Sequence, residues 1–235
     1  MTSLSDFPIT GLFPPERPDA IQLYSLPTPN GVKVSAALEE LGADYEPHLI
    51  RFGDNMQKSP EFLALNPNGK IPAIIDPHGP DGEPIPIFES GAILFYLAEK
   101  TGKLMPKDPV GRLECLQWLF FQMSAVGPMF GQFGHFFHFK KDQLNDTYPV
   151  DRYTEESRRL VDVLDKRLDG RSWILGDEYS IADIATFPWL RSVRDFYKGG
   201  DAVGLSDFTR VVDWLDRCLE RPASQKALNI PPRPQ

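Results

Sequence analysis

Residues 66–100 constrain the fold of this chain more than any other stretch. They open with the turn signal NPNG and continue through a β-branched run at 71–75, a loop rich in Gly, Pro and Asp, and a second apolar run at 85–88. After Glu89 and Ser90, the residues have the composition and length of a helix. The stretch is therefore predicted to be a β-hairpin that leads directly into a helix N-terminus.

Glu89 and Ser90 stand at this predicted helix start. The Ser90 hydroxyl is expected to cap the helix, and free amides at a helix N-terminus attract a carboxylate. Glu89 supplies the opposite charge, which suits an ammonium group. Together they could hold the amino-acid end of a small zwitterion, although an ordinary capped helix with a surface glutamate explains the same two residues.

Composition narrows the possible function classes. The 235 residues are 41% hydrophobic and carry a formal net charge of −8, which argues against general nucleic-acid binding because phosphates require clustered Lys and Arg. No run of 18 apolar residues occurs, and the N-terminal residues lack the pattern of a secretory signal. We therefore expect a cytoplasmic protein with no membrane partner.

Cysteine and histidine spacing favours neither disulfides nor a metal. Cys115 and Cys218 lie among apolar helical neighbours, so both are expected to be buried, reduced thiols. The histidines include no metal-ligand spacing beyond a single i, i+3 pair, and no metal site is predicted. They are His48, His78, His135 and His138.

The first hundred residues have the pattern of a mixed α/β domain. Residues 1–20 contain four prolines and are expected to form an extended arm that wraps the surface or stays mobile. Residues 21–25 alternate like a half-buried strand, and an amphipathic helix is expected over residues 32–41. A second strand at 45–50 and a short helix at 59–65 follow. With the hairpin and its helix, the order is βαβαββα, which predicts a thioredoxin-like domain with a mixed sheet at 21–103.

No strand pattern follows residue 103, so residues 104–235 are predicted to form an all-α helical bundle domain with a proline-rich tail. A long helix is expected to begin at Asp108 and to kink or break at Gly127-Pro128. Ser180 and Asp183 have the spacing of a capping box. The predicted helices span 108–133, 150–168, 180–194 and 206–220, with a short one after 222.

Three motifs in order, NPNGKIPAI, FESGAILFYLAEK and SIADI, occur in this two-domain arrangement. With them the chain resembles the glutathione transferase superfamily over roughly residues 21–228. The segments PTPNG and GPMFGQ, the latter followed by HF, are similar to the nu class, bacterial glutathione-dependent disulfide-bond reductases related to the fungal nitrogen-regulation prion protein.

The resemblance implies a glutathione site. In this fold the Ile71-Pro72 bond is expected to be cis, and the Ile71 backbone pairs with the cysteinyl part of glutathione like an added strand. Glu89 and Ser90 match the clamp for the γ-glutamyl group. The other matching positions are Gln57, Lys70 and Arg152. Arg152 could instead form a local salt bridge to Asp151 or Glu155, or it could reach across a dimer interface.

The turn after the first strand has no Cys-x-x-Cys pair, so the reacting sulfur is expected to come from glutathione. Its thiolate would be stabilised by the Thr28 hydroxyl, the Asn30 amide and the N-terminus of the following helix. Lowering a thiol pKa from about 8.5 to about 6.5 takes ~2.7 kcal/mol, which one or two charge-assisted hydrogen bonds can supply. Alternatively, the Thr28 hydroxyl only satisfies local backbone groups.

The segment 129–139 contains five phenylalanines, too many at mixed spacing for one core-facing stripe. It is therefore a candidate pocket for the second substrate, although a core role for half of the rings fits equally well. The predicted lining residues are Met129, Gln132, Phe133, His135 and Phe136. His135 is favoured as a structural hydrogen-bond partner rather than a base.

The leading hypothesis is an enzyme that reduces a small disulfide with glutathione, with weaker activity on hydroperoxides and electrophiles. The alternatives are a conventional conjugating glutathione transferase and a non-enzymatic regulator that retains the fold. A homodimer is expected, with residues 50–100 of one subunit against the first long helices of the other. The family resemblance motivates this expectation, together with Phe52 and Met56, because a single domain would leave their loop exposed.

Overall fold

The structure, a computed structural model, describes residues 3–233. By its internal contacts the chain forms two units. The first contains the residues up to Lys103 together with the segment from Pro222 onward, and the second is Leu104–Arg221. Among the described residues, no helix is long and apolar enough to cross a membrane.

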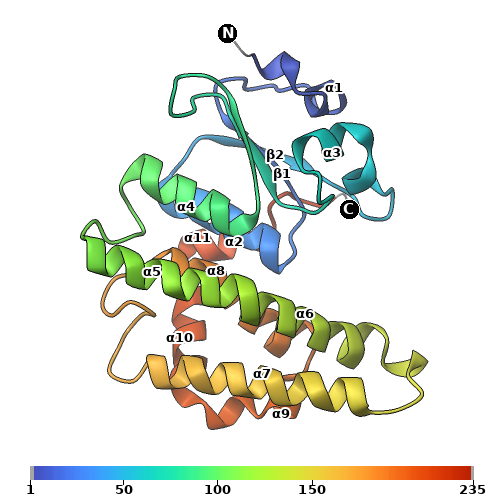
Figure 1. The fold of residues 1–235 in the computed structure, drawn as a ribbon, viewed down its shortest axis with the longest axis vertical. Helices are drawn as coiled ribbons and strands as arrows, with labels where there is room; N and C mark the ends of the chain where they lie inside the picture. Colours follow the sequence, from blue (N-terminus) through green and yellow to red (C-terminus); the bar gives the residue numbers. More distant parts are fainter. Residues whose placement is uncertain (1–2, 234–235) are drawn as a thin grey trace. The chain divides into compact units, whose positions relative to one another are not determined.

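A four-stranded mixed sheet forms the centre of the first unit (Figure 1). The strands are β1 (Ile21–Ser25), β2 (Tyr45–Leu49), β3 (Ala73–Asp76) and β4 (Ile85–Phe88), in the order β2-β1-β3-β4. Only the β1–β2 pair is parallel. This topology confirms the predicted thioredoxin-like order. β1 is buried along its whole length rather than on one face, because it is an inner strand and both sheet faces are covered.

Helices α2 (Pro29–Leu41) and α4 (Ser90–Thr101) lie side by side in the first unit (Figure 1). Their packing explains the burial of residues 31–38 of α2. α2 ends as predicted at Gly42, whose φ of 61° gives the left-handed C-cap that glycine adopts without steric cost. On the other sheet face, α3 (Pro60–Leu65) contributes Phe62 to a core cluster with Tyr24.

The final helix, α11 (Pro222–Ala227), packs against α2. The Ser35 hydroxyl of α2 donates to the carbonyl oxygen of Ala227 at 3.1 Å. The sequence-based division placed residues 222–235 in the helical domain, whereas their contacts group them with the first unit. The hydrophobic pattern marked the helix but carried no information about which surface it covers.

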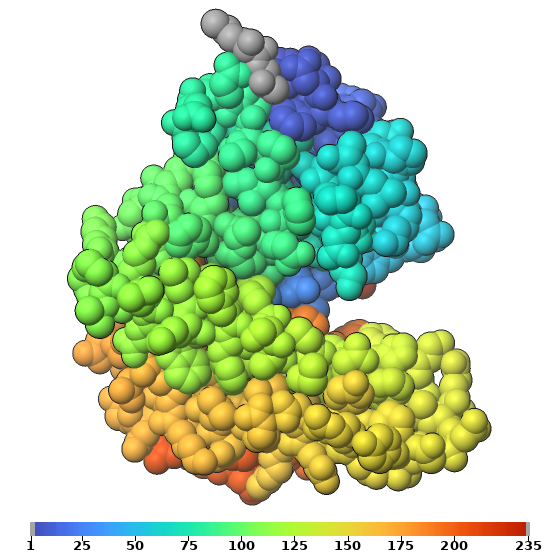
Figure 2. Space-filling view, viewed as in Figure 1, coloured from blue at the N-terminus to red at the C-terminus, as the bar shows by residue number. Residues whose placement is uncertain are grey.

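The N-terminal arm packs on the first unit, as one of the two predicted alternatives had it, but its described residues form short helical turns and are not extended. Residues 1 and 2 lie outside the described part. A 3₁₀ turn at Leu4–Asp6 precedes the short helix α1 (Ile9–Leu12). Ile9 is 1% exposed, and α1 contacts α3, so the blue N-terminal atoms lie beside cyan ones (Figure 2). Burial of Ile9, with Leu4, Phe7 and Phe13 packed against the same core cluster, therefore fixes the arm despite its prolines.

The regular elements of the second unit are helices throughout the described residues. The longer ones are α5 (Pro109–Phe121), α6 (Gly127–Gly134), α7 (Tyr148–Arg167), α8 (Ile181–Arg191) and α10 (Thr209–Glu220). Short turns of helix occur at Lys141–Gln143, α9 (Gly200–Val203) and Leu205–Asp207. The predicted all-α character is confirmed.

Three π-helical segments extend these helices: Gln122–Val126, His135–Phe139 and Ser192–Phe196. The first joins α5 to α6 without a break, and Gly127 keeps a right-handed helical conformation. The predicted break at Gly127-Pro128 is therefore absent. Because Pro128 cannot donate a backbone hydrogen bond, a wide π turn before it lets the helix continue.

The capping box at the start of α8 is confirmed. Asp183 is fully buried and accepts hydrogen bonds from the backbone and hydroxyl of Ser180 at 3.0 Å, the Ile174 N–H at 2.9 Å and the Trp214 indole at 2.8 Å. Burial raises the pKa of Asp183, and these four donors oppose that shift.

Candidate functional site

The sulfur turn lies between β1 and α2. Thr28 is the N-cap of α2, and its Oγ1 accepts from the Gly31 N–H at 3.4 Å. A Cβ at position 31 would lie 1.9 Å from the Leu26 carbonyl oxygen, so only glycine permits this tight turn. Asn30 follows as the second helical residue, and both side chains are half-buried. This arrangement presents a hydroxyl and an amide at a helix N-terminus.

At the second predicted site, Glu89 rather than Ser90 is the N-cap of α4. Glu89 adopts a φ of 70°, which is uncommon for a residue other than glycine, and its side chain makes no capping hydrogen bond. Its carboxylate is exposed, and Ser90 is the buried first residue of the helix. The predicted Ser90 cap is therefore wrong, because the hairpin turns one residue earlier and leaves the acidic side chain outside.

Lys33 links α2 to the start of α4 and was missed by the sequence analysis. It is 1% exposed, and its Nζ donates to Ser90 Oγ at 3.3 Å. Burial lowers the pKa of Lys33 to about 7, and the nearby Glu89 charge opposes this effect. One signal was available in the sequence, because Lys33 is the one charged residue in the otherwise apolar and small run 31–38.

The segment before β3 has the predicted backbone. The Ile71-Pro72 bond is cis, as expected from the resemblance. Pairing of β3 with its neighbours begins at Ala73, so Ile71 lies just outside the sheet ladder. The nearby Gln57 is half-buried, and its Oε1 has no hydrogen-bond partner among the described residues. Lys70 is exposed.

The two cysteines are both fully buried in the second unit, as predicted. Burial raises the pKa of the Cys115 thiol to about 12, and the charge of Asp183 adds to the shift. A thiol held in this state is not a nucleophile at neutral pH. The described residues contain no cluster of three or more His, Cys, Asp or Glu that could hold a metal ion.

The predicted acceptor residues on α6 and the following π segment differ in exposure. Gln132 and His135 are exposed, Met129 is half-buried, and half-buried Phe136 stacks on Tyr153 at 5.5 Å between ring centroids. Phe133 is fully buried and stacks on Phe137 at 4.7 Å. Its placement fits the alternative of a core ring.

Arg152 lies near the start of α7, in the second unit, and is exposed. Its Nη1 is 4.0 Å from Glu156 Oε2, one helical turn away. The local ion pair considered from the sequence thus involves Glu156 rather than Asp151 or Glu155, because i, i+4 residues share a helix face.

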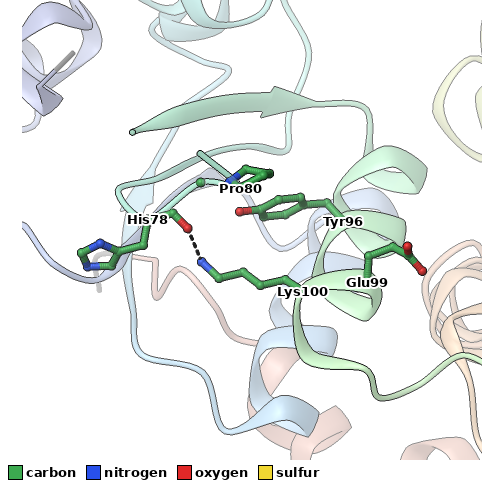
Figure 3. Close-up of a pocket in the computed structure, with 6 residues that line it drawn as sticks. His78, Pro80, Tyr96, Glu99 and Lys100 are labelled. Atoms are coloured by element: carbon green, nitrogen blue, oxygen red, sulfur yellow. Dashed lines mark hydrogen bonds between the residues drawn. The ribbon is translucent and has the colours of Figure 1, made fainter. Parts of the chain in front are cut away.

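An open pocket of about 310 Å³ lies beside α4, away from these residues (Figure 3). Its lining residues are His78, Gly79, Pro80, Tyr96, Glu99 and Lys100. Lys100 donates to the His78 carbonyl oxygen at 2.7 Å and also pairs with buried Asp76. Its ammonium group therefore holds the loop between β3 and β4 against α4.

The chain belongs to the glutathione S-transferase family, because both domains of that family match. The N-terminal domain matches residues 19–99, and the C-terminal domain matches residues 126–222. The resemblance seen in the sequence is confirmed.

Individual members of the family are similar to this chain over most of its length. The chain is 44% identical over 210 residues to the disulfide-bond oxidoreductase YfcG of Escherichia coli, covering 88% of this chain and 94% of that protein. A glutathione transferase from Burkholderia graminis with two glutathione molecules bound per subunit has 59% identity and a TM-score of 0.97, covering 100% and 98% of the two chains. One from Pseudomonas putida with one glutathione disulfide bound has 55% identity and a TM-score of 0.96, covering 98% and 100%.

Proposed function

We propose that this chain is an enzyme that reduces disulfide bonds with glutathione, using the thiolate of the bound glutathione and no cysteine of its own. The observation that carries the proposal is the turn before α2, where Thr28 stands at a helix N-terminus in place of a redox cysteine pair while both cysteines are buried. The name of the Escherichia coli relative and the glutathione bound in the similar structures support the same activity.

The reaction proceeds by two thiol–disulfide exchanges. The glutathione thiolate attacks one sulfur of the substrate disulfide, forms a mixed disulfide and releases the other sulfur as a thiolate, which takes up a proton. A second glutathione thiolate attacks the glutathione sulfur of the mixed disulfide and yields glutathione disulfide and the second thiol. The exchange is fastest when the attacking thiol has a pKa near ambient pH.

Thr28 and the helix start are suited to stabilise that thiolate. The Thr28 oxygen accepts from the Gly31 N–H, which leaves its own hydrogen to donate to sulfur. Asn30 adds an amide, and the partial positive charge of the helix N-terminus favours an anion. The Thr28 hydroxyl can therefore cap the helix through its oxygen and bind the thiolate through its hydrogen at the same time.

Glutathione itself would be held by the remaining residues of the first unit. The exposed Glu89 carboxylate is suited to the ammonium group of the γ-glutamyl moiety, and Ser90 and the α4 amides to its carboxylate. The cysteinyl part would pair with the Ile71 backbone, and the unsatisfied Gln57 Oε1 offers a further acceptor. The binding of glutathione by Lys70 and Arg152, and of the second substrate by segment 129–139, stay predictions.

Two assays test the reaction. Turnover of 2-hydroxyethyl disulfide with glutathione is expected to exceed conjugation of glutathione to an aryl halide. The reverse order would indicate a conventional transferase, and failure to bind glutathione in a titration would favour the non-enzymatic regulator. Hydroperoxide reduction is expected as a weaker activity.

Glu89→Ala tests the clamp. The variant should bind glutathione more weakly by about 1.5–3 kcal/mol, the range for hydrogen bonds to charged groups. It should raise KM for glutathione more than it lowers kcat. Glu99→Ala removes the same charge from an exposed position on the last turns of α4 and serves as the control. Equal glutathione affinities for both variants by calorimetry would show that Glu89 only supports the fold.

We also propose a homodimer in the cytoplasm, without nucleic-acid or membrane partners. In the first unit, Phe52 is 44% exposed and Phe88 is 38% exposed. Met56 was expected to be exposed as well, but it packs against the core cluster. α5 exposes Leu113 and Phe120 by 63% and 62%. These apolar side chains fit the proposed contact between residues 50–100 and the first long helices. Light scattering should give twice the 26.5 kDa mass of the chain, and a single-chain mass at micromolar concentration would refute the dimer.

A further inference from the structure

Lys33 is a buried charged group for which the proposed reaction has no use. It lies in the buried stretch of α2, five residues after the Thr28 cap. Helical side chains lean toward the helix N-terminus, so Lys33 reaches back to the first turn of α4 and donates to Ser90 Oγ at 3.3 Å. Lysine is almost never fully buried unless it is paired. A buried lysine that contacts the first residue of α4 therefore needs an explanation.

We propose that Lys33 is a positioning residue that orients the Ser90 hydroxyl and supplies positive charge beneath the carboxylate of the γ-glutamyl group. The inference rests on the proposed glutathione function. An ammonium group only donates, so Ser90 must use an oxygen lone pair toward Lys33, and its O–H bond then points away from the lysine. That orientation is the one needed to donate to a ligand carboxylate.

The charges around Lys33 influence the pH range in which its side chain is protonated. Glu89, at the start of α4, is the acidic group whose charge favours the ammonium form against burial. β1 contains no acidic or basic side chain, and α11 brings Lys226 to Glu39, in the last turn of α2. With a pKa of about 7, Lys33 loses its proton as the pH rises through neutrality. A bound carboxylate favours the protonated form, so ligand binding should draw in a proton.

S-methylglutathione has no thiol to titrate, and comparing the wild type with Lys33→Met at each pH cancels the titration of the ligand's ammonium group, which both proteins share. The wild-type affinity for it should fall as the pH rises from about 6 to about 8.5, with proton uptake measured by calorimetry in two buffers of different ionisation enthalpy. Lys33→Met should bind on the order of tenfold more weakly at the acidic end and keep only the pH dependence that comes from the ligand's ammonium group. Lys226→Met, which removes a lysine that also contacts α2, should match the wild type.

A double-mutant cycle tests the route through Ser90. Lys33→Met should weaken binding less in a Ser90→Ala background than in the wild type, because the two residues share one interaction. A merely structural lysine would change stability without changing the pH dependence of binding. Lys33→Met should fold, since it removes a buried charge whose neighbour Glu89 is exposed.

The outcomes separate the two proposals. Wild-type binding with the same affinity and proton uptake in folded Lys33→Met would overturn the positioning role and leave the glutathione function intact. Absence of proton uptake in the wild type would overturn it as well, even if the variant did not fold. Independent effects in the cycle would overturn the link through Ser90. If the wild type does not bind S-methylglutathione or glutathione, the proposed function fails and the role of Lys33 fails with it.

Discussion

Among the helix N-termini that begin with a hydroxyl cap, those of α2 and α8 use it differently. At α8, the Ser180 hydroxyl accepts from the Ala182 N–H at 3.2 Å and donates to Asp183, and both side chains are buried. At α2, half-buried Thr28 accepts from Gly31, and its hydrogen has no acceptor among the described residues. The Ser180 hydroxyl at the start of α8 therefore has all its hydrogen bonds within the protein, whereas the Thr28 hydroxyl at the start of α2 keeps a hydrogen that a ligand can accept.

This difference distinguishes a folding device from a binding device. A buried polar group must satisfy its hydrogen bonds within the protein, and each unmade bond there costs stability. A helix start that keeps donors near the surface loses little, because water replaces the missing partner until a ligand arrives. Mutations at α8 should therefore change stability, and mutations at α2 should change chemistry.

The largest expected effect is on the stability of the α8 start. Asp183→Asn keeps the shape but replaces one acceptor oxygen with an NH₂ group, so two of the four donors facing Asp183 lose their acceptor. The free energy of unfolding should fall by about 2–5 kcal/mol, measured by denaturant unfolding. Glutathione affinity of the folded fraction should stay unchanged. A loss of affinity at full stability would contradict the division between the two helix starts.

Thr28→Ala tests the α2 start with a smaller effect. Without the hydroxyl, the pKa of the bound glutathione thiol should rise by about one unit, equivalent to ~1.4 kcal/mol, and the pH–rate profile should shift toward alkaline pH. Loss of the cap should lower stability by about 1 kcal/mol. Measuring the thiolate absorbance of bound glutathione against pH checks the shift directly.

Two matched variants separate capping from thiolate binding. Thr28→Ser keeps both functions and should behave like the wild type. Thr28→Asp caps a helix well but has no proton to donate when ionised, and it adds a negative charge beside sulfur. It should therefore fold normally and lose more turnover than Thr28→Ala. Normal turnover in Thr28→Asp would assign Thr28 to capping alone.

The sequence predicted the features that depend on local spacing. The Ser180–Asp183 box is an i, i+3 pattern, and the βαβαββα order follows from short apolar runs separated by turn residues. The cis bond before Pro72 came from the resemblance, which local spacing alone would not have provided.

The missed features depend on distant packing. Lys33 fits an amphipathic helix pattern, but α4 and α11 cover α2 and enclose it. The folded arm depends on the contact of α1 with α3. Glu89 replaced Ser90 as the cap because the hairpin geometry fixed its backbone at a positive φ. Such long-range contacts leave little trace in a single sequence.

The smallest expected effect on activity completes the comparison. Cys115 lies close enough to the saturated α8 start for the Asp183 charge to raise its thiol pKa further, so the region that stabilises the second unit also keeps this sulfur unreactive. Cys115→Ala combined with Cys218→Ala should lose stability only through packing, about 1 kcal/mol or somewhat more per site. Disulfide reductase activity per folded molecule should be retained, because the thiolate belongs to glutathione at the α2 start. If the cysteine-free protein keeps its circular dichroism spectrum but loses activity, a protein thiol takes part in the exchange, and the chemistry is not confined to α2.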